Sequence, residues 1–294
     1  MTSRRTFLQG VAAAGGAAII GRTADTDWKK QPGLELYTVR DLTGKDYEGT
    51  LAKVAEIGYK EVEPATDYGH MEPKQFRALL DRYGLTAPST HVAATEGPTL
   101  EQQLEGFQIM GIRYTEVKAR GDGGRPGEES VKRTAAQVNH FGQVVQKFGM
   151  KMLIHNHTEE LQPIPGSSLL PYDILLAETD PALVAMQLDI GWASVAGRNI
   201  REMFRKSPGR FELWHVKDAR GIKTMTPKMT QTQRKDEALL VPVGQGEVHY
   251  KALFADAELA GLKHYAIEQD NAADWGDSMA AARVSLRNLM KLLS

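Results

Sequence analysis

The stretch that decides the fold is residues 47–64, YEGTLAKVAEIGYKEVEP. Its first part, 47–57, carries apolar side chains at the spacing of one helix face, and Gly58 follows at once. A glycine just past a helix end takes the left-handed conformation that closes the helix. The apolar-rich run 59–64 then predicts a buried strand. A helix, a glycine and a strand thus follow one another directly.

The same junction of an apolar residue, a glycine and another apolar residue recurs at four more places: Tyr83-Gly84-Leu85, Met110-Gly111-Ile112, Phe148-Gly149-Met150 and Ala260-Gly261-Leu262. Around these junctions we expect strands at 33–38, 59–64, 85–91, 112–118, 151–155, 184–190, 211–217 and 262–268. Helices are expected at 47–57, 73–83, 100–110, 129–148, 171–178, 200–205, 250–260 and 277–293. Eight strands, each followed by a helix, predict a single parallel (β/α)8 barrel over residues 25–294. The longest irregular stretch, 218–247, follows the seventh strand and is expected to lie over the barrel mouth.

The first residues are expected to lie outside this barrel. Ser3-Arg4-Arg5-Thr6-Phe7-Leu8-Gln9 and the apolar run 10–21 resemble a twin-arginine export signal, which we place at residues 1–24. The resemblance implies transport by the twin-arginine machinery and a periplasmic or secreted protein. The apolar run is short for a membrane span, and without cysteine the chain cannot carry a lipoprotein anchor, so no stable membrane anchor is expected.

The composition of the chain limits its partners and the ligands of any metal site. The net charge of −1 argues against nucleic acid as a partner. Because the chain has no cysteine, a transition-metal site has to use histidine and carboxylate ligands. The last four strands offer such a set at their carboxyl ends, where barrel active sites lie: Glu160, Asp189, His215 and Glu268. Three carboxylates and one imidazole favour one divalent ion of Mn, Mg, Co or Zn.

Five pieces of the sequence carry a family resemblance: Leu36-Tyr37-Thr38-Val39-Arg40, His155-Asn156-His157, Leu188-Asp189, His215-Val216-Lys217-Asp218 and Ile267-Glu268-Gln269-Asp270. Taken in order they resemble the xylose-isomerase-like barrel superfamily, which includes sugar phosphate isomerases and epimerases, inosose dehydratases and endonuclease IV-type barrels. The resemblance implies a metal held by Glu, Asp, His and Glu from strands five to eight. Asp189, His215 and Glu268 match that pattern. For strand five we choose Glu160, with Glu159 and His155 as open alternatives.

These residues predict a metal-dependent isomerase or epimerase that acts on a non-phosphorylated sugar or ketosugar through a metal-stabilised enediolate. Glu160 and Glu268 are the expected catalytic residues, and one or the other has the double role of metal ligand and base. The expected contacts to substrate oxygens or the sugar ring are His91, His157, Trp192 and Lys217. One alternative is a lyase or dehydratase that eliminates from a 3-keto-glycoside or an inosose. Another is a non-catalytic carbohydrate-binding barrel, and a homo-oligomer is an alternative to a monomer because residues 218–247 could cover a neighbouring mouth.

Each of these residues also has an ordinary structural interpretation. Asp189 and Glu268 could cap helices or pair with Lys217. His215 could be a core histidine with both nitrogens satisfied, and His91 could serve in structural hydrogen bonds. Strand alternation sends only one of the two histidines 155 and 157 inward.

Overall fold

A parallel sheet of seven strands forms the centre of the protein in a computed structural model, which describes residues 27–118, 127–226 and 228–294. The predicted export signal, residues 1–24, lies outside the described residues. The strands run in the order β2 (Glu61–Glu63), β1 (Pro32–Glu35), β11 (His264–Ile267), β8 (Leu213–Val216), β7 (Val184–Asp189), β6 (Lys151–His155) and β4 (Tyr114–Thr115). Every neighbouring pair is parallel, which brings the carboxyl ends to one side.

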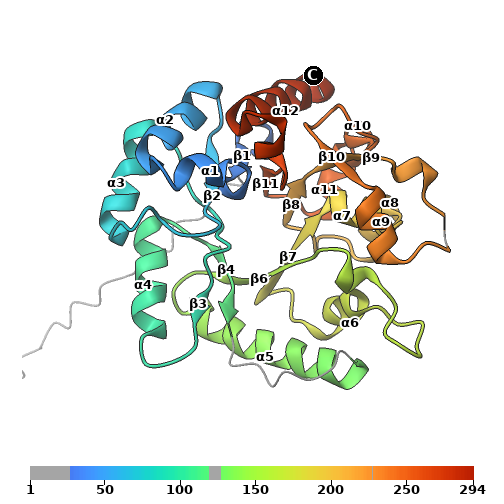
Figure 1. Cartoon of the computed structure of the whole chain (residues 1–294). Helices are drawn as coiled ribbons and strands as arrows, with labels where there is room; N and C mark the ends of the chain where they lie inside the picture. Colours follow the sequence, from blue (N-terminus) through green and yellow to red (C-terminus); the bar gives the residue numbers. More distant parts are fainter. Residues whose placement is uncertain (1–26, 119–126, 227) are drawn as a thin grey trace, which may run out of the picture.

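The sheet curls, and residues 85–91 join its two edges (Figure 1). Thr86 forms an isolated bridge with Glu61 of β2, and Ser89 forms one with Tyr114 of β4. Pro88 lies between them and has no N–H to donate, so the predicted third strand is present only as these single bridges. The α/β barrel predicted from the sequence is confirmed.

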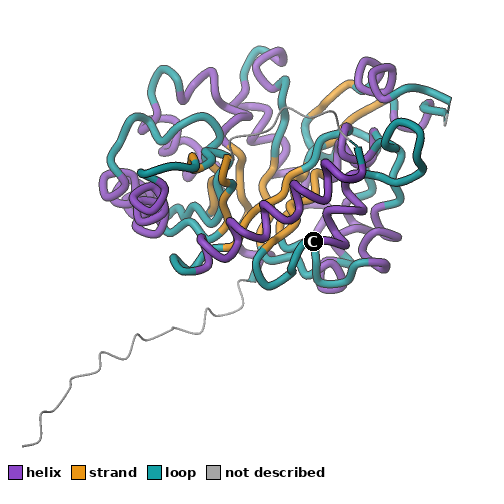
Figure 2. Tube along the Cα trace, turned by 90° about the horizontal axis from the view of Figure 1, so that it is seen from below, coloured by secondary structure: helices purple, strands orange, loops and turns teal. Residues whose placement is uncertain are grey.

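The helices surround the strands, as Figures 1 and 2 show. They are α2 (Tyr47–Ile57), α3 (Pro73–Tyr83), α4 (Leu100–Met110), α5 (Glu128–Gln146), α6 (Pro171–Glu178), α8 (Ile200–Lys206), α10 (Tyr250–Phe254), α11 (Ala257–Ala260) and α12 (Ser278–Leu293). The helix expected at 250–260 is divided into α10 and α11. All five junction glycines have positive φ, from 64° at Gly84 to 115° at Gly58. Four of them directly follow a helix, whereas α5 ends at Gln146, three residues before Gly149.

The described part of residues 218–247 is folded rather than irregular. β9 (Asp218–Arg220) pairs antiparallel with β10 (Leu239–Val241), and α9 (Gln231–Glu237) lies between them in the chain. Shorter elements also follow the strands: η2 (Leu36–Val39) and α1 (Arg40–Thr43) after β1, η3 (Glu159–Leu161) after β6, α7 (Ile190–Val195) after β7, and η5 (Ala272–Trp275) after β11. β3 (Ala94–Thr95) and β5 (Val117–Lys118) form a small separate parallel pair. β5 follows β4 closely in the chain, whereas β3 precedes α4.

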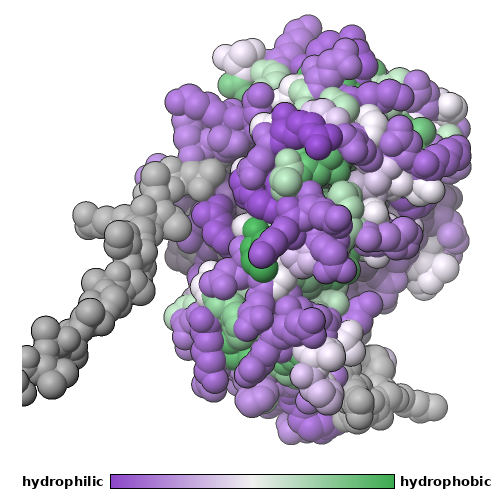
Figure 3. Space-filling view, turned by 90° about the vertical axis from the view of Figure 1, so that its left-hand side faces the viewer, coloured by the Kyte–Doolittle hydropathy of each residue, from purple (hydrophilic) through white to green (hydrophobic). Residues whose placement is uncertain are grey.

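The apolar core lies between the strands and the helices. Outward-facing strand residues such as Leu34, Val62, Trp214 and Ile267 are at most 1% exposed. The surface seen in Figure 3 is mainly hydrophilic, with small separate apolar areas. In the described part of the chain, no helix combines the length and apolar character that crossing a bilayer requires.

Candidate functional site

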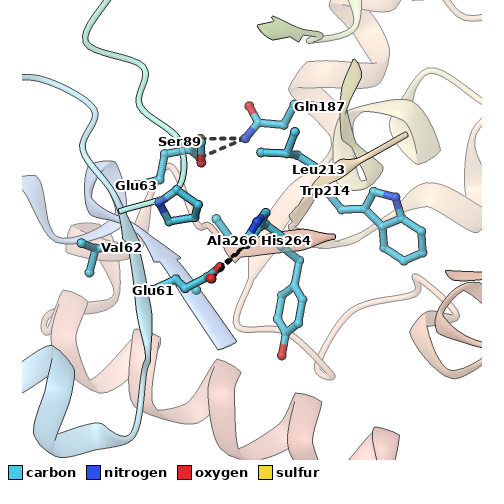
Figure 4. Close-up of a pocket in the computed structure, with 12 residues that line it drawn as sticks. Glu61, Val62, Glu63, Ser89, Gln187, Leu213, Trp214, His264 and Ala266 are labelled. Atoms are coloured by element: carbon cyan, nitrogen blue, oxygen red, sulfur yellow. Dashed lines mark hydrogen bonds and ion pairs between the residues drawn. The ribbon is translucent and has the colours of Figure 1, made fainter. Parts of the chain in front are cut away.

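The interior of the barrel is lined by polar layers. Alternate residues of a strand face the same side, so Glu61 and Glu63 of β2 both point inward. Glu61 contacts His264 Nδ1 at 2.9 Å, whereas Glu63 accepts from Gln187 Nε2 at 2.8 Å, one layer nearer the mouth. A cavity of about 10 Å³ lies among these two layers (Figure 4). The inward polar side chains therefore continue through the barrel to its carboxyl end.

His215 is the centre of the upper layer. Its Nδ1 lies 2.8 Å from Glu268 Oε2, and its Nε2 lies 2.6 Å from Glu63 Oε2. Burial lowers the pKa of the imidazole, but the charges of Glu35 and Glu63 outweigh it and raise the pKa well above the ordinary value. Burial raises the pKa of Glu63, but His91 and His215 hold it to about 2. His215 is thus a buried histidine with a carboxylate on each side.

Three of the four predicted metal ligands lie together. Asp189, His215 and Glu268 are buried, and one ligand atom from each lies within 4.8 Å of the others. Asp189 also caps α7, because its Oδ1 accepts from Trp192 N at 2.7 Å. Its Oδ2 faces Lys217 Nζ at 3.0 Å. The cap and the ion pair considered from the sequence are therefore both present, within the same cluster that could hold a metal.

Lys217 is surrounded by carboxylates. Its Nζ lies 2.9 Å from Glu268 Oε2 and 2.9 Å from Asp270 Oδ2, in addition to Asp189. Burial lowers the pKa of Lys217, but these carboxylates raise it well above the ordinary value. The ammonium also lies 5.1 Å from the centre of the Trp192 ring. The residue predicted to contact substrate is therefore fully buried beside the candidate ligands.

The strand-five candidates separate in space. β6 ends at His155, and Glu160 lies in the following η3, where its Oε2 accepts from His157 N at 2.8 Å. Glu160 forms a candidate metal group with His157 and Glu159, and among the described residues no candidate group joins it to the triad. The His155 ring centre lies 4.6 Å from that of His215, and its buried Nδ1 has no hydrogen-bond partner. Of the alternatives kept open, His155 is the one the structure places against a triad residue.

Other residues complete the cluster. His91 stacks on His215 with ring centres 5.2 Å apart, and its Nε2 contacts Gln187 Oε1 at 2.7 Å. Glu35, Glu63 and Asp270 were not among the site residues predicted from the sequence. Strand alternation was the signal that could have found Glu63, because it shares its face with the inward-pointing Glu61.

The donor set fits a divalent cation. Four buried carboxylates, on Glu35, Glu63, Asp189 and Glu268, lie around the buried imidazole of His215 and the buried ammonium of Lys217. Burial and the Glu268 charge raise the pKa of Glu35 well above the ordinary value, and Glu35 Oε2 has no hydrogen-bond partner. A crowded set of oxygen donors with neighbouring imidazoles is the kind of site that hard or borderline dications occupy.

The fold and this cluster define an α/β barrel with a candidate metal site at the carboxyl ends of its strands. The chain belongs to the xylose isomerase-like TIM barrel family, whose sequence profile matches residues 51–289. The family membership and fold expected from the sequence are thereby confirmed.

Curated relatives of the chain are enzymes. It is 26% identical to an inosose dehydratase of Geobacillus thermodenitrificans over 261 residues, 77% of this chain and 83% of the relative. A local match to an inosose dehydratase of Bacillus licheniformis is 32% identical over 99 residues, and covers 32% of this chain and 30% of that protein.

Solved structures share the fold. A sugar phosphate isomerase/epimerase from Parabacteroides distasonis superimposes with a TM-score of 0.72 at 19% identity, over 90% of this chain and 100% of that one. The IOLI protein with a bound zinc atom superimposes with a TM-score of 0.65 at 13% identity, over 90% and 98% of the two chains.

Proposed function

We propose that the protein is a divalent-metal-dependent enzyme that removes a proton from the carbon next to a carbonyl in a non-phosphorylated sugar, ketosugar or inosose. The observation that carries the proposal is the buried group of Asp189, His215 and Glu268 at the ends of three neighbouring strands. A bound dication would polarise substrate oxygens and acidify the adjacent C–H.

For the fourth ligand we propose His155, because its buried Nδ1 has no partner and its ring contacts that of His215. Burial, together with the neighbouring rings of His215 and His91, lowers the pKa of His155 well below its ordinary value, which favours the neutral ring that a ligand must have. Glu160, the ligand chosen from the sequence, is then the proposed proton acceptor. It lies half-buried in η3, with its carboxylate bound to a backbone N–H, whereas Glu268 is held by His215 and Lys217.

Two fates of the deprotonated substrate are open to such a site. If a hydroxyl or glycosidic oxygen leaves from the β-carbon, the enzyme is a dehydratase or lyase. The inosose dehydratases among its relatives favour this fate. If the proton returns to another carbon or to the opposite face, the enzyme is an isomerase or epimerase. In both cases His91 and His157 are the proposed contacts to substrate oxygens.

We also propose that the protein is exported and that its substrate carries no phosphate. The Arg4-Arg5 pair and the apolar run after it support export by the twin-arginine route to the periplasm or beyond. Outside the cytoplasm, neutral sugars are a more accessible class of substrate than the sugar phosphates of central metabolism. A reporter fused after residue 40 tests this: retention of the unchanged fusion in the cytoplasm would contradict export, and continued export of a fusion with Arg4 and Arg5 changed to Lys would contradict the twin-arginine route.

The metal site is tested by binding alone. We expect purified protein to bind one Mn²⁺, measured by the EPR signal of free Mn²⁺, and Asp189→Asn or His155→Asn to weaken binding. Glu160→Gln should retain binding and lose turnover. Loss of Mn²⁺ binding in Glu160→Gln but not in His155→Asn would return the ligand role to Glu160. Absence of binding in the wild type would overturn the metal-dependent function.

The reaction is tested with inososes, 3-keto-glucosides and free ketoses in D2O. Loss of water or release of the aglycone, detected by mass spectrometry, supports elimination. Solvent deuterium in a product of unchanged formula supports isomerisation or epimerisation. Neither outcome with any of these substrates would contradict the proposed reaction.

A further inference from the structure

The Lys217 ammonium lies where two candidate metal ligands converge. Its Nζ is 3.0 Å from Asp189 Oδ2 and 2.9 Å from Glu268 Oε2, and the residue is 0% exposed. These two carboxylates also belong to the triad with His215. The carboxylates of Asp189 and Glu268 therefore pair with the Lys217 ammonium and are also candidate ligands for a metal.

The position of Lys217 is built into the surrounding structure. Gly191 approaches the lysine so closely that a Cβ there would lie 2.6 Å from Lys217 O and 2.7 Å from its Cβ. Tyr250 fixes the backbone on another side, because its hydroxyl donates to Lys217 O at 2.7 Å. These two contacts hold the backbone and the Cβ of Lys217 in place, so its ammonium is directed at Asp189 and Glu268.

Three carboxylates enclose the ammonium, those of Asp189, Glu268 and Asp270. Its hydrogen bond to Asp270 Oδ1, at 3.1 Å, uses one of its three N–H groups, whereas Asp189 Oδ2 faces it in an ion pair without a hydrogen bond. Because the residue is 0% exposed, a sugar oxygen can reach Lys217 only after a carboxylate has moved. A dication that takes Asp189 and Glu268 would also repel the ammonium strongly at this separation, since both charges are buried.

We propose that Lys217 is the internal counter-ion that a divalent metal must displace from Asp189 and Glu268, so that the lysine sets the metal affinity. The inference rests on the metal site proposed above. Once displaced, Lys217 retains Asp270 and has two N–H groups free for substrate oxygens. Metal binding thereby precedes the substrate contact predicted for this lysine, and the site loads in a fixed order.

The test compares Mn²⁺ binding by the wild type and by Lys217→Met, with the full chain and with Mn²⁺ alone as probe. We expect the variant to bind with a Kd at least about tenfold lower, because a competing buried charge is gone. Mn²⁺ should also raise the melting temperature of the variant more than that of the wild type. The matched control is Lys235→Met: this lysine also lies over the Trp192 ring, at 5.4 Å, but pairs with Glu159. Its Kd should stay within about twofold of the wild type.

The outcomes separate the two proposals. Mn²⁺ binding by Lys217→Met but not by the wild type supports the counter-ion role and overturns the metal-dependent function. An equal or higher Kd in Lys217→Met overturns the counter-ion role and leaves that function standing. If Lys217→Met is insoluble both with and without Mn²⁺, the test uses Asp270→Asn instead. In that variant Lys217 has only Asp189 and Glu268 as carboxylate partners, so it should compete with Mn²⁺ more strongly and raise the Kd. An unchanged Kd would overturn the inference.

Discussion

Replacing Asp218 by asparagine should destabilise the whole barrel, although this residue lies outside the proposed metal site. The side chain is 1% exposed and accepts four backbone hydrogen bonds. Oδ1 accepts from Ala219 at 2.9 Å and Val248 at 3.1 Å, and Oδ2 accepts from Gly244 at 2.9 Å and Gly246 at 3.0 Å. One carboxylate thus joins the two ends of the segment that contains β9, α9 and β10.

The magnitude follows from which bonds asparagine can keep. Its single carbonyl oxygen can replace one carboxylate oxygen, and its NH2 group then faces two N–H donors that it cannot bind. A hydrogen bond to a charged group contributes about 1.5–3 kcal/mol, and an unsatisfied buried donor costs about 1–3 kcal/mol. Burial raises the pKa of Asp218, although four backbone N–H groups bind its carboxylate, so burying this charge has a cost. Asparagine carries no charge and avoids that cost, which offsets part of the loss. The expected loss in the free energy of unfolding is about 3 kcal/mol.

Urea unfolding followed by circular dichroism measures this loss, and hydrogen exchange locates it. We expect amides of residues 219–247 to exchange faster in Asp218→Asn. The control is Asp46→Asn, because Asp46 is an exposed N-cap that accepts one bond, from Gly49, and asparagine caps helices as well as aspartate. The control should change the free energy by less than about 0.5 kcal/mol. An equally small effect of Asp218→Asn would refute the reasoning.

Two further changes probe ion pairs at opposite ends of the barrel. Burial raises the pKa of Glu212, but hydrogen bonds from Lys151 and Lys263 outweigh it and lower the pKa below its ordinary value. The stability advantage of the wild type over Glu212→Gln should therefore be constant near neutral pH and shrink below about pH 4, in urea titrations across that range; an advantage that grows towards acid would contradict this. Lys235→Ala should lower the free energy of unfolding by less than about 1 kcal/mol, since its pair with Glu159 is partly exposed, yet speed amide exchange in α9. Unchanged exchange in α9 would show that the pair does not hold this helix.

The sequence predicted those helices and strands whose ends depend on neighbouring residues in the chain. The helices α2, α3, α4 and α6 begin and end at the predicted residues, because glycine or proline marks their ends. The third strand was expected to be continuous, but Pro88 interrupts its hydrogen bonding, and only its bridges remain. The segment 218–247 was not resolved into elements, because its β9–β10 pairing depends on residues far apart in the chain.

The sequence could place the side chains at strand ends in the site, but it could not place those that lie beyond them. Asp189, His215 and Glu268 lie at strand ends, where the barrel geometry brings inward side chains together. Glu160 lies five residues beyond the end of β6, in a 3₁₀ turn, so strand alternation no longer fixes its direction. The three carboxylates around Lys217 come from two strand ends, Asp189 from β7 and both Glu268 and Asp270 from the residues after β11, and no local pattern predicts that they meet at one ammonium.

The clamp at Asp218 also has a consequence for how this barrel could diversify. Because one carboxylate fastens both ends of the segment, a single residue fixes where the segment leaves the barrel and where it returns. Such a closed excursion can be lengthened, shortened or exchanged while the strand ends beneath it keep their positions. Residues 219–247 are therefore an exchangeable unit: grafting the corresponding segment of another barrel between the same anchor points would place a different surface above unchanged strand ends.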